Sequence, residues 1–218
     1  RHDEAVEARE KAAEIDPTCD QAVALAEVRV ERAEARVRER RKALEKAKGD
    51  PSLEKALADR VRERWQLVVD EYARLVEQYP GMLPDIHLRL GEGCYELGRL
   101  TSDQGLVLQS IAELQREYTK QTHRDRASIL LGRAFIQIGM HHLARKHFTQ
   151  IIDRIGELDT AERRDVLFEA FYELATVLET TGDLDGALGA YEEIFRRDVN
   201  WRDVADRVLS LNARIQAR

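Results

Sequence analysis

The sequence contains little proline and little glycine. Its 218 residues include 4 prolines and 12 glycines, whereas 35% of the residues are charged and 43% are apolar. Proline and glycine are the residues that most often interrupt helices, so their restriction to a few positions predicts long uninterrupted helical segments. The composition therefore indicates an almost entirely helical protein.

Long apolar runs and paired cysteines are also missing. No apolar run approaches the ~20 residues of a membrane-spanning helix, so we expect no membrane span. No signal peptide is visible, but the sequence opens inside the amphipathic segment 4–15, which predicts a fragment of a longer chain. The two cysteines, Cys19 and Cys94, have neither metal-binding nor redox spacing, and we expect ordinary thiols.

The residue constellations that support catalysis are absent as well. There is no glycine-rich phosphate loop and no zinc-protease helix motif. His141, His142 and His147 lack the three- or four-residue spacing of a helical metal pair, so we expect them to face solvent. Carboxylate pairs such as Glu192 and Glu193 are expected on a solvated helix face. The sequence thus predicts a protein that is not an enzyme and holds no cofactor and no metal.

A helical pattern with one break occupies residues 126–154. Its first half has apolar residues at helical spacing, namely Ile129, Leu130, Ala134, Phe135 and Ile138. Gly139 then predicts a helix end. A second apolar series follows at Leu143, Ala144, Phe148, Ile151 and Ile152. This pattern predicts a helical hairpin that needs neighbours to bury its apolar faces.

The same pattern recurs further along the chain. Aligning Leu131 with Leu174 superposes Gly132 on Ala175, Phe135 on Leu178, Gly139 on Gly182, Ala144 on Ala187, Phe148 on Tyr191 and Ile151 on Ile194. Upstream, Leu90, Gly91 and Gly98 fit the same template. This order of residues resembles the tetratricopeptide repeat family. The resemblance implies an all-helical solenoid of helical hairpins that binds peptides or protein surfaces and has no catalytic chemistry of its own.

The N-terminal third carries a different, longer pattern. From Asp20 to Lys48 there is no glycine or proline, and small apolar residues alternate by four and three, as in a closely packed helix pair. Gly49, Asp50 and Pro51 then provide a helix C-cap, an N-cap and a first-turn proline. A second apolar stripe continues to Tyr79. We therefore predict an extended antiparallel helical hairpin within one chain, the alternative being a coiled coil that recruits a second chain.

The predicted organisation has four parts. They are the second helix of a truncated repeat at 1–17, the long antiparallel hairpin at 18–80, three tetratricopeptide-like hairpins at 81–200 and a C-terminal capping helix at 201–218. Thr101 with Gln104, and Asp159 with Glu162, are predicted to cap helix starts. Trp201 opens the apolar face of the last helix, so we expect its ring to anchor that helix near Leu188 and Tyr191, as the end of a solenoid requires.

The turn of the long hairpin is rich in positive charge. Residues 36–64 contain eleven Lys or Arg and six Asp or Glu, a net of +5 in a chain whose net charge is -6. The candidate binding residues at this tip are Arg38, Arg41, Lys42 and Lys46. A basic tip on an acidic body predicts an acidic protein partner. Nucleic acid is the alternative partner, with less support because no base-stacking aromatic pattern accompanies the charge. The alternative is a solvated surface with pairs such as Arg36 with Glu39.

The family resemblance implies a second candidate surface. First helices of tetratricopeptide hairpins line a concave groove, and counting from the repeat leucines places on it Arg89, Glu92, Tyr95, Arg126, Arg133, Gln137, Tyr172 and Thr176. The asparagines and lysines with which this family binds a C-terminal carboxylate are not at those positions. The arginines are suited to an acidic peptide, and a solvated groove is the alternative.

Together these observations predict a non-catalytic scaffold or adaptor that binds a partner protein or peptide through its groove or its long hairpin. The alternatives are a nucleic-acid-associated protein that uses the basic tip, or the interaction region of a larger enzyme. The sequence leaves the oligomeric state open.

Overall fold

A computed structural model describes residues 2–15, 18–47, 50–82, 85–155 and 161–217. Every regular element in these ranges is an α-helix, and none of the described residues forms a strand. The chain divides into two compact units, residues 1–113 and 114–218, and the division falls inside helix α5. The predicted all-helical architecture of successive helical hairpins is confirmed, including the long hairpin near the N-terminus.

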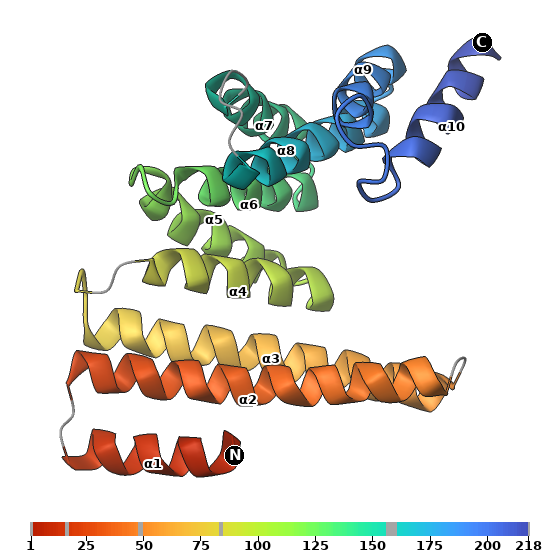
Figure 1. Cartoon of the computed structure of the whole chain (residues 1–218). Helices are drawn as coiled ribbons and strands as arrows, with labels where there is room; N and C mark the ends of the chain where they lie inside the picture. The colour runs from red at the N-terminus through yellow and green to blue at the C-terminus, as the bar shows by residue number, and fades with distance from the viewer. Residues whose placement is uncertain (1, 16–17, 48–49, 83–84, 156–160, 218) are drawn as a thin grey trace. The chain divides into compact units, whose positions relative to one another are not determined.

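Unit 1 contains α1 (His2–Ile15), α2 (Cys19–Lys46), α3 (Pro51–Gln78), α4 (Ile86–Thr101) and the start of α5 (Gln104–Tyr118). Each helix packs against the next, α1 on α2, α2 on α3 and α3 on α4 (Figure 1). The helices α2 and α3 have 28 residues each, about twice the 14 of α1 and the 16 of α4. The antiparallel pair α2–α3 therefore extends past the ends of α1 and α4 (Figure 1).

The start of α3 is fixed by local chemistry that the sequence predicted. The Asp50 carboxylate accepts a hydrogen bond from the Ser52 backbone N–H at 2.9 Å, and Pro51 occupies the first turn. An acidic N-cap satisfies a backbone donor that would otherwise lack a helical partner. Consistent with this bond, hydrogen bonding from Ser52 lowers the pKa of Asp50. The predicted capping glycine, Gly49, lies outside the described residues.

The apolar core of unit 1 is concentrated at one end of the long hairpin. Its buried members come from the first half of α2, the second half of α3, and α4, namely Ala22, Ala26, Val68, Val69, Tyr72, Leu75, Ile86, Leu90, Cys94 and Leu97. In the distal half, residues 36–47 and 50–64, Val37 is the one fully buried side chain among the described residues. That half is therefore held mainly by contact between α2 and α3 themselves.

The junction of α4 and α5 differs from the prediction. The helix α4 runs through Gly98 to Thr101, whose hydroxyl donates back to the Leu97 carbonyl at 2.8 Å rather than capping the next helix. The cap of α5 is Asp103, whose carboxylate accepts from the backbone N–H groups of Gly105 at 2.8 Å and Leu106 at 3.2 Å. The predicted Thr101–Gln104 capping box is thus wrong, because a carboxylate nearer the helix takes the role.

Unit 2 contains the end of α5, followed by α6 (Arg124–Gln137), α7 (His141–Ile155), α8 (Ala161–Thr180), α9 (Leu184–Phe195) and α10 (Val204–Gln216). Successive helices pack together from α6 to α10, and α6 also contacts α8. Gly139 and Gly182 have φ angles of 76° and 88°, the left-handed conformation expected just past a helix end. The predicted cap residue Asp159 lies outside the described residues.

The last helix covers the α8–α9 hairpin. Val204, Val208 and Leu211 of α10 join a core with Ala187, Tyr191 and Ile194 of α9 and with Phe168, Ala175 and Leu178 of α8. The helix begins at Val204, three residues later than predicted, and Trp201 precedes it. The Trp201 ring packs edge-on against Phe168 at 5.9 Å and Tyr172 at 5.5 Å between centroids. Its aromatic partners are therefore on α8, and the predicted neighbours Leu188 and Tyr191 belong to the same core cluster.

Candidate functional site

The distal half of α2 presents a dense set of unpaired cations. Five exposed side chains there have no hydrogen-bond or ion partner among the residues that the structure describes, namely Arg36, Arg40, Arg41, Lys42 and Lys46. Arg38, between them, is 61% exposed, and its guanidinium lies 3.9 Å from the Glu34 carboxylate. Three of the four tip residues predicted from the sequence are thus free, and Arg36 and Arg40 extend the set. The predicted pair of Arg36 with Glu39 does not form.

The cations of α3 in the same half of the hairpin are mostly neutralised. Arg60 pairs with Glu63 at 2.5 Å, and Arg62 lies 3.5 Å from Asp59. Arg64 reaches across to Glu34 on α2 at 2.5 Å, with its guanidinium 3.7 Å from the centroid of the Trp65 ring. The unpaired positive charge of the hairpin is therefore concentrated on α2.

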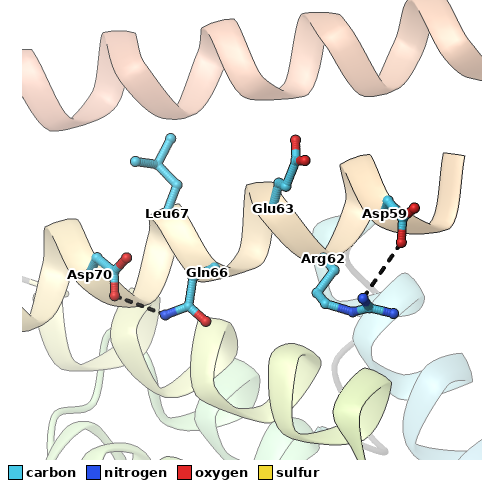
Figure 2. Close-up of a pocket in the computed structure, with 6 residues that line it drawn as sticks. All are labelled: Asp59, Arg62, Glu63, Gln66, Leu67 and Asp70. Carbon is cyan, nitrogen blue, oxygen red and sulfur yellow. Dashed lines mark hydrogen bonds and ion pairs between the residues drawn. The ribbon is translucent and has the colours of Figure 1, made fainter. Parts of the chain in front are cut away.

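A shallow hollow of about 550 Å³ lies beside α3 and has an acidic lining (Figure 2). Its polar lining consists of Asp59, Arg62, Glu63, Gln66 and Asp70. Within it Arg62 pairs with Asp59, and the Gln66 amide donates to Asp70 at 2.9 Å. Three carboxylates against one guanidinium give this side of α3 the opposite charge from distal α2.

The predicted groove residues of unit 1 are engaged by the chain itself. Arg89 donates to the Tyr72 hydroxyl at 3.0 Å and lies 3.3 Å from the Glu27 carboxylate. Tyr95 is buried, with 8% of its surface exposed, and so cannot line an open groove. Glu92 is half-buried and also has an interaction partner. Burial raises the pKa of Tyr72, so its neutral phenol persists as the partner of Arg89.

In unit 2, Arg133 is enclosed between two carboxylates of α8. Its guanidinium lies 2.6 Å from Glu169 and 2.7 Å from Glu173, and Glu169 also lies 3.2 Å from Arg202. The pKa of Arg133 is raised by the two glutamates in spite of the opposing effect of burial. Arg126 and Gln137 are exposed, and Arg126 has an interaction partner. Of the predicted groove residues in this unit, only Gln137 is both exposed and free of partners among the described residues.

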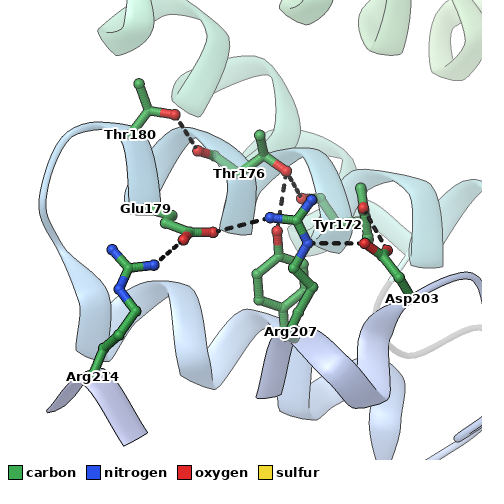
Figure 3. Close-up of polar contacts among 8 residues, drawn as sticks. Tyr172, Thr176, Glu179, Thr180, Asp203, Arg207 and Arg214 are labelled. Carbon is green, nitrogen blue, oxygen red and sulfur yellow. Dashed lines mark hydrogen bonds and ion pairs between the residues drawn. The ribbon is translucent and has the colours of Figure 1, made fainter. Parts of the chain in front are cut away.

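The last two predicted groove residues, Tyr172 and Thr176, contact the start of α10 and α9 respectively (Figure 3). The Tyr172 hydroxyl donates to Asp203 at 2.7 Å, and Asp203 also accepts from Arg207 at 3.0 Å. Arg207 and Arg214 both reach Glu179 (Figure 3). Thr176 contacts the Tyr191 hydroxyl at 3.2 Å. The sequence pattern does not reveal this network, because Asp203, Arg207 and Glu179 meet only after α10 has packed.

The side chains that could support chemistry have structural surroundings. His147 is not solvent-facing as predicted, since it stacks on Phe135 and contacts the edge of Tyr118, and burial lowers its pKa. The Cys94 thiol is buried, and burial raises its pKa to about 12. In the described ranges no group of three or more His, Cys, Asp or Glu side chains is arranged to hold a metal ion. Likewise, no helix in those ranges is long and apolar enough to cross a membrane.

Comparisons with known proteins yield a distant structural likeness. No family model and no curated protein matches the sequence. A solved structure that resembles the chain is the crystal structure of BtubC (BKLC) from P. vanneervenii, with 15% sequence identity and a TM-score of 0.45 over 100% of this chain and 90% of that one. A likeness this distant identifies neither a family nor a function.

Proposed function

We propose that this protein is a non-catalytic interaction scaffold of the tetratricopeptide type, and that the distal half of α2 docks an acidic surface of a partner protein. The observation that supports this most directly is the set of five exposed cations without partners on a helix pair that extends past its neighbours. Arg38, Lys42 and Lys46 follow one another at four-residue intervals, so they share one side of α2 over about 12 Å. An acidic helix with carboxylates at the same interval would match this stripe.

The state of the groove favours the hairpin as the docking surface. Arg89 and Arg133 already hold carboxylates or a phenol of the same chain, and a ligand would have to displace those contacts. Partner carboxylates meet no such competition at Arg41, Lys42 and Lys46. Free cations also accelerate the encounter with an acidic surface through long-range attraction.

A protein partner fits the hairpin better than nucleic acid does. Residues 36–47 contain no aromatic side chain on which a base could stack, and Glu39 and Glu45 interrupt the positive charge. Phosphate backbones favour surfaces of one sign, whereas interspersed charges suit an acidic protein surface of mixed sign. The buried thiol of Cys94 and the stacked ring of His147 support a non-catalytic role, because neither group is presented to a substrate.

The test compares two matched triple variants of the full chain. One removes the free cations of α2 (Arg41→Gln, Lys42→Gln, Lys46→Gln), and the other removes three cations of α3 in the same half of the hairpin (Lys55→Gln, Arg60→Gln, Arg62→Gln). Proteins captured from an extract by the unaltered chain are identified, and each is then purified and titrated against both variants. Since an exposed ion pair contributes up to about 1 kcal/mol, the α2 variant should bind its partner roughly tenfold more weakly. The α3 variant should bind almost as tightly as the unaltered chain.

Two further arms separate the alternatives. A duplex DNA and a single-stranded RNA are titrated against the unaltered chain and the α2 variant at physiological salt. If the unaltered chain binds either nucleic acid and the α2 variant does not, the nucleic-acid alternative is favoured. A Gln137→Ala, Arg126→Gln variant probes the groove. If that variant loses the partner while the α2 variant retains it, the docking surface is the groove and the proposal fails.

A further inference from the structure

A separate cavity in unit 2 gathers three arginines from three helices. It has a volume of about 520 Å³, and its lining includes Arg124 at the start of α6, Arg154 near the end of α7 and Arg163 in the first turn of α8. Among the described residues of the lining Asp125 is the one carboxylate, so these residues together carry a net charge of +2 in a chain whose net charge is -6. Positive charge therefore accumulates here against the overall balance of the chain.

Two of the three guanidinium groups are held in place. Arg124 donates through Nε to the Tyr118 carbonyl at 3.4 Å, and its guanidinium lies 5.8 Å from the centroid of the Tyr118 ring. Arg154 forms an ion pair with Asp125. Each contact uses part of a guanidinium that has five N–H donors, so both arginines retain donors for a ligand. Side chains that are already oriented lose less conformational entropy when a ligand binds.

The remaining polar groups of the lining are free. Arg163, Gln121 and Thr122 are exposed and have no hydrogen-bond or ion partner within the part of the chain that the structure describes. They add a third guanidinium, an amide and a hydroxyl as donors. Beneath these groups the side chain of Ile155, which is 1% exposed, closes the cavity with an apolar surface. Hydrogen bonds made against an apolar surface compete less with water.

We propose that this cavity binds a phosphate monoester. At neutral pH such a group carries nearly two negative charges on three acceptor oxygens, which match the net charge and the donors of the lining. One guanidinium can donate two parallel hydrogen bonds to two oxygens of a phosphate, and three guanidinium groups can surround one phosphate. A carboxylate offers one charge and two oxygens and would leave one arginine uncompensated. The cavity is larger than a phosphate group, so it can also hold part of the esterified molecule. This site lies in unit 2 and is independent of the docking function proposed for α2.

The experiment titrates the whole chain of 218 residues, labelled with ¹⁵N, and follows the arginine Nε–H resonances. The probes are inorganic phosphate, phosphoserine, adenosine monophosphate and, as a carboxylate control, acetate. We expect saturable shifts of the Arg124, Arg154 and Arg163 resonances with the phosphates and only weak effects with acetate. Tighter binding of phosphoserine than of adenosine monophosphate would identify a phosphorylated protein segment as the source of the ester, and the reverse order would identify a nucleotide.

A matched pair of variants decides whether the cavity is responsible. Arg163→Gln removes an exposed side chain without partners, so folding should be unaffected, and phosphate affinity should fall about tenfold with the loss of one charge-assisted hydrogen bond. Arg145→Gln removes the same charge from an exposed position of α7 outside the cavity and should leave the affinity unchanged. Equal losses in both variants, or equal binding of acetate and phosphate, would overturn the proposal, since either result would indicate only general attraction of anions.

Discussion

Replacing Gly132 by alanine should destabilise unit 2, although the same replacement usually strengthens a helix. Gly132 lies inside α6 and faces the Phe148 ring of α7. A Cβ atom at this position would lie 2.4 Å from both Cε1 and Cζ of Phe148, whereas ordinary contacts begin near 3.4 Å. The Phe148 ring is fully buried, so it cannot move into solvent. The ring would have to shift by about 1 Å within a close-packed interior.

The magnitude follows from two opposing effects. Alanine is better than glycine in a helix by about 1 kcal/mol. Overpacking a rigid core costs about 1–3 kcal/mol, and the severity of this contact points to the upper end. The expected result is a net loss of about 2 kcal/mol in the free energy of unfolding of unit 2. Gly189 in α9 is the matched control, since a Cβ there meets nothing within 4 Å. Gly189→Ala should therefore stabilise the protein by up to about 1 kcal/mol.

Urea denaturation followed by tryptophan fluorescence measures both effects. The chain has two tryptophans, Trp65 in unit 1 and Trp201 in unit 2, so a Trp65→Phe background reports on unit 2 alone. The double variant Gly132→Ala, Phe148→Leu removes the ring atoms that the new methyl group would meet. Its loss of stability should be smaller than the sum of the two single losses. An unchanged or increased stability of Gly132→Ala would refute the packing argument.

Three further outcomes can be measured directly. Iodoacetamide should label Cys19 in the folded protein and Cys94 only after unfolding, because the Cys94 thiol is buried and its pKa is about 12; rapid labelling of both would contradict the core assignment. The pKa of Tyr172 is raised from its ordinary value near 10 to about 12, by burial and by its hydrogen bond to Asp203. The neutral phenol therefore stabilises the fold fully below pH 10, and this contribution is lost as the pH rises through 12. The melting temperature of Tyr172→Phe should therefore decline less between pH 10 and pH 12 than that of the unaltered chain. Finally, Trp201→Ala should lower the free energy of unfolding by about 2–3 kcal/mol, less than for a fully buried tryptophan because the ring is only partly buried. Denaturation followed by circular dichroism measures this loss. As the control, Leu209→Ala at an exposed position of α10 should change the free energy of unfolding by less than about 0.5 kcal/mol.

Local sequence signals predicted the helices well. Asp50 and Pro51 specify the start of α3 within one turn, and the left-handed backbone of Gly139 and Gly182 ends α6 and α8 as expected. These features depend on neighbours within a few residues, so the sequence contains the information directly. Even here competition between neighbours matters, since Asp103 displaced the predicted Thr101 cap because its carboxylate reaches the free backbone donors of α5.

The candidate surfaces were less predictable because their state depends on distant partners. The repeat pattern places Arg133 on the groove, yet its guanidinium pairs with Glu169 and Glu173, which are 36 and 40 residues later in the sequence. Tyr95 was assigned to the groove by repeat position but is buried by tertiary packing. The free cations of α2 were easier to predict, because residues 36–47 contain six Lys or Arg and only two Glu, too few acids to neutralise the positive charge of this stretch.

The incomplete burial of the distal hairpin has a dynamic consequence. Residues 36–47 and 50–64 have contacts mainly between the two helices α2 and α3, whereas the other end of the same helices also packs against α1 and α4. Resistance to local opening should therefore be lower in residues 36–47 and 50–64 than at the other end of the pair, so their amide hydrogens should exchange with solvent faster. Repulsion among Arg36, Arg40 and Arg41 favours this opening, and a partner that neutralises them would slow exchange where the free chain exchanges fastest. Binding of a partner to the hairpin would then be measured as slower amide exchange in its distal half, without any movement of the end that packs against α1 and α4.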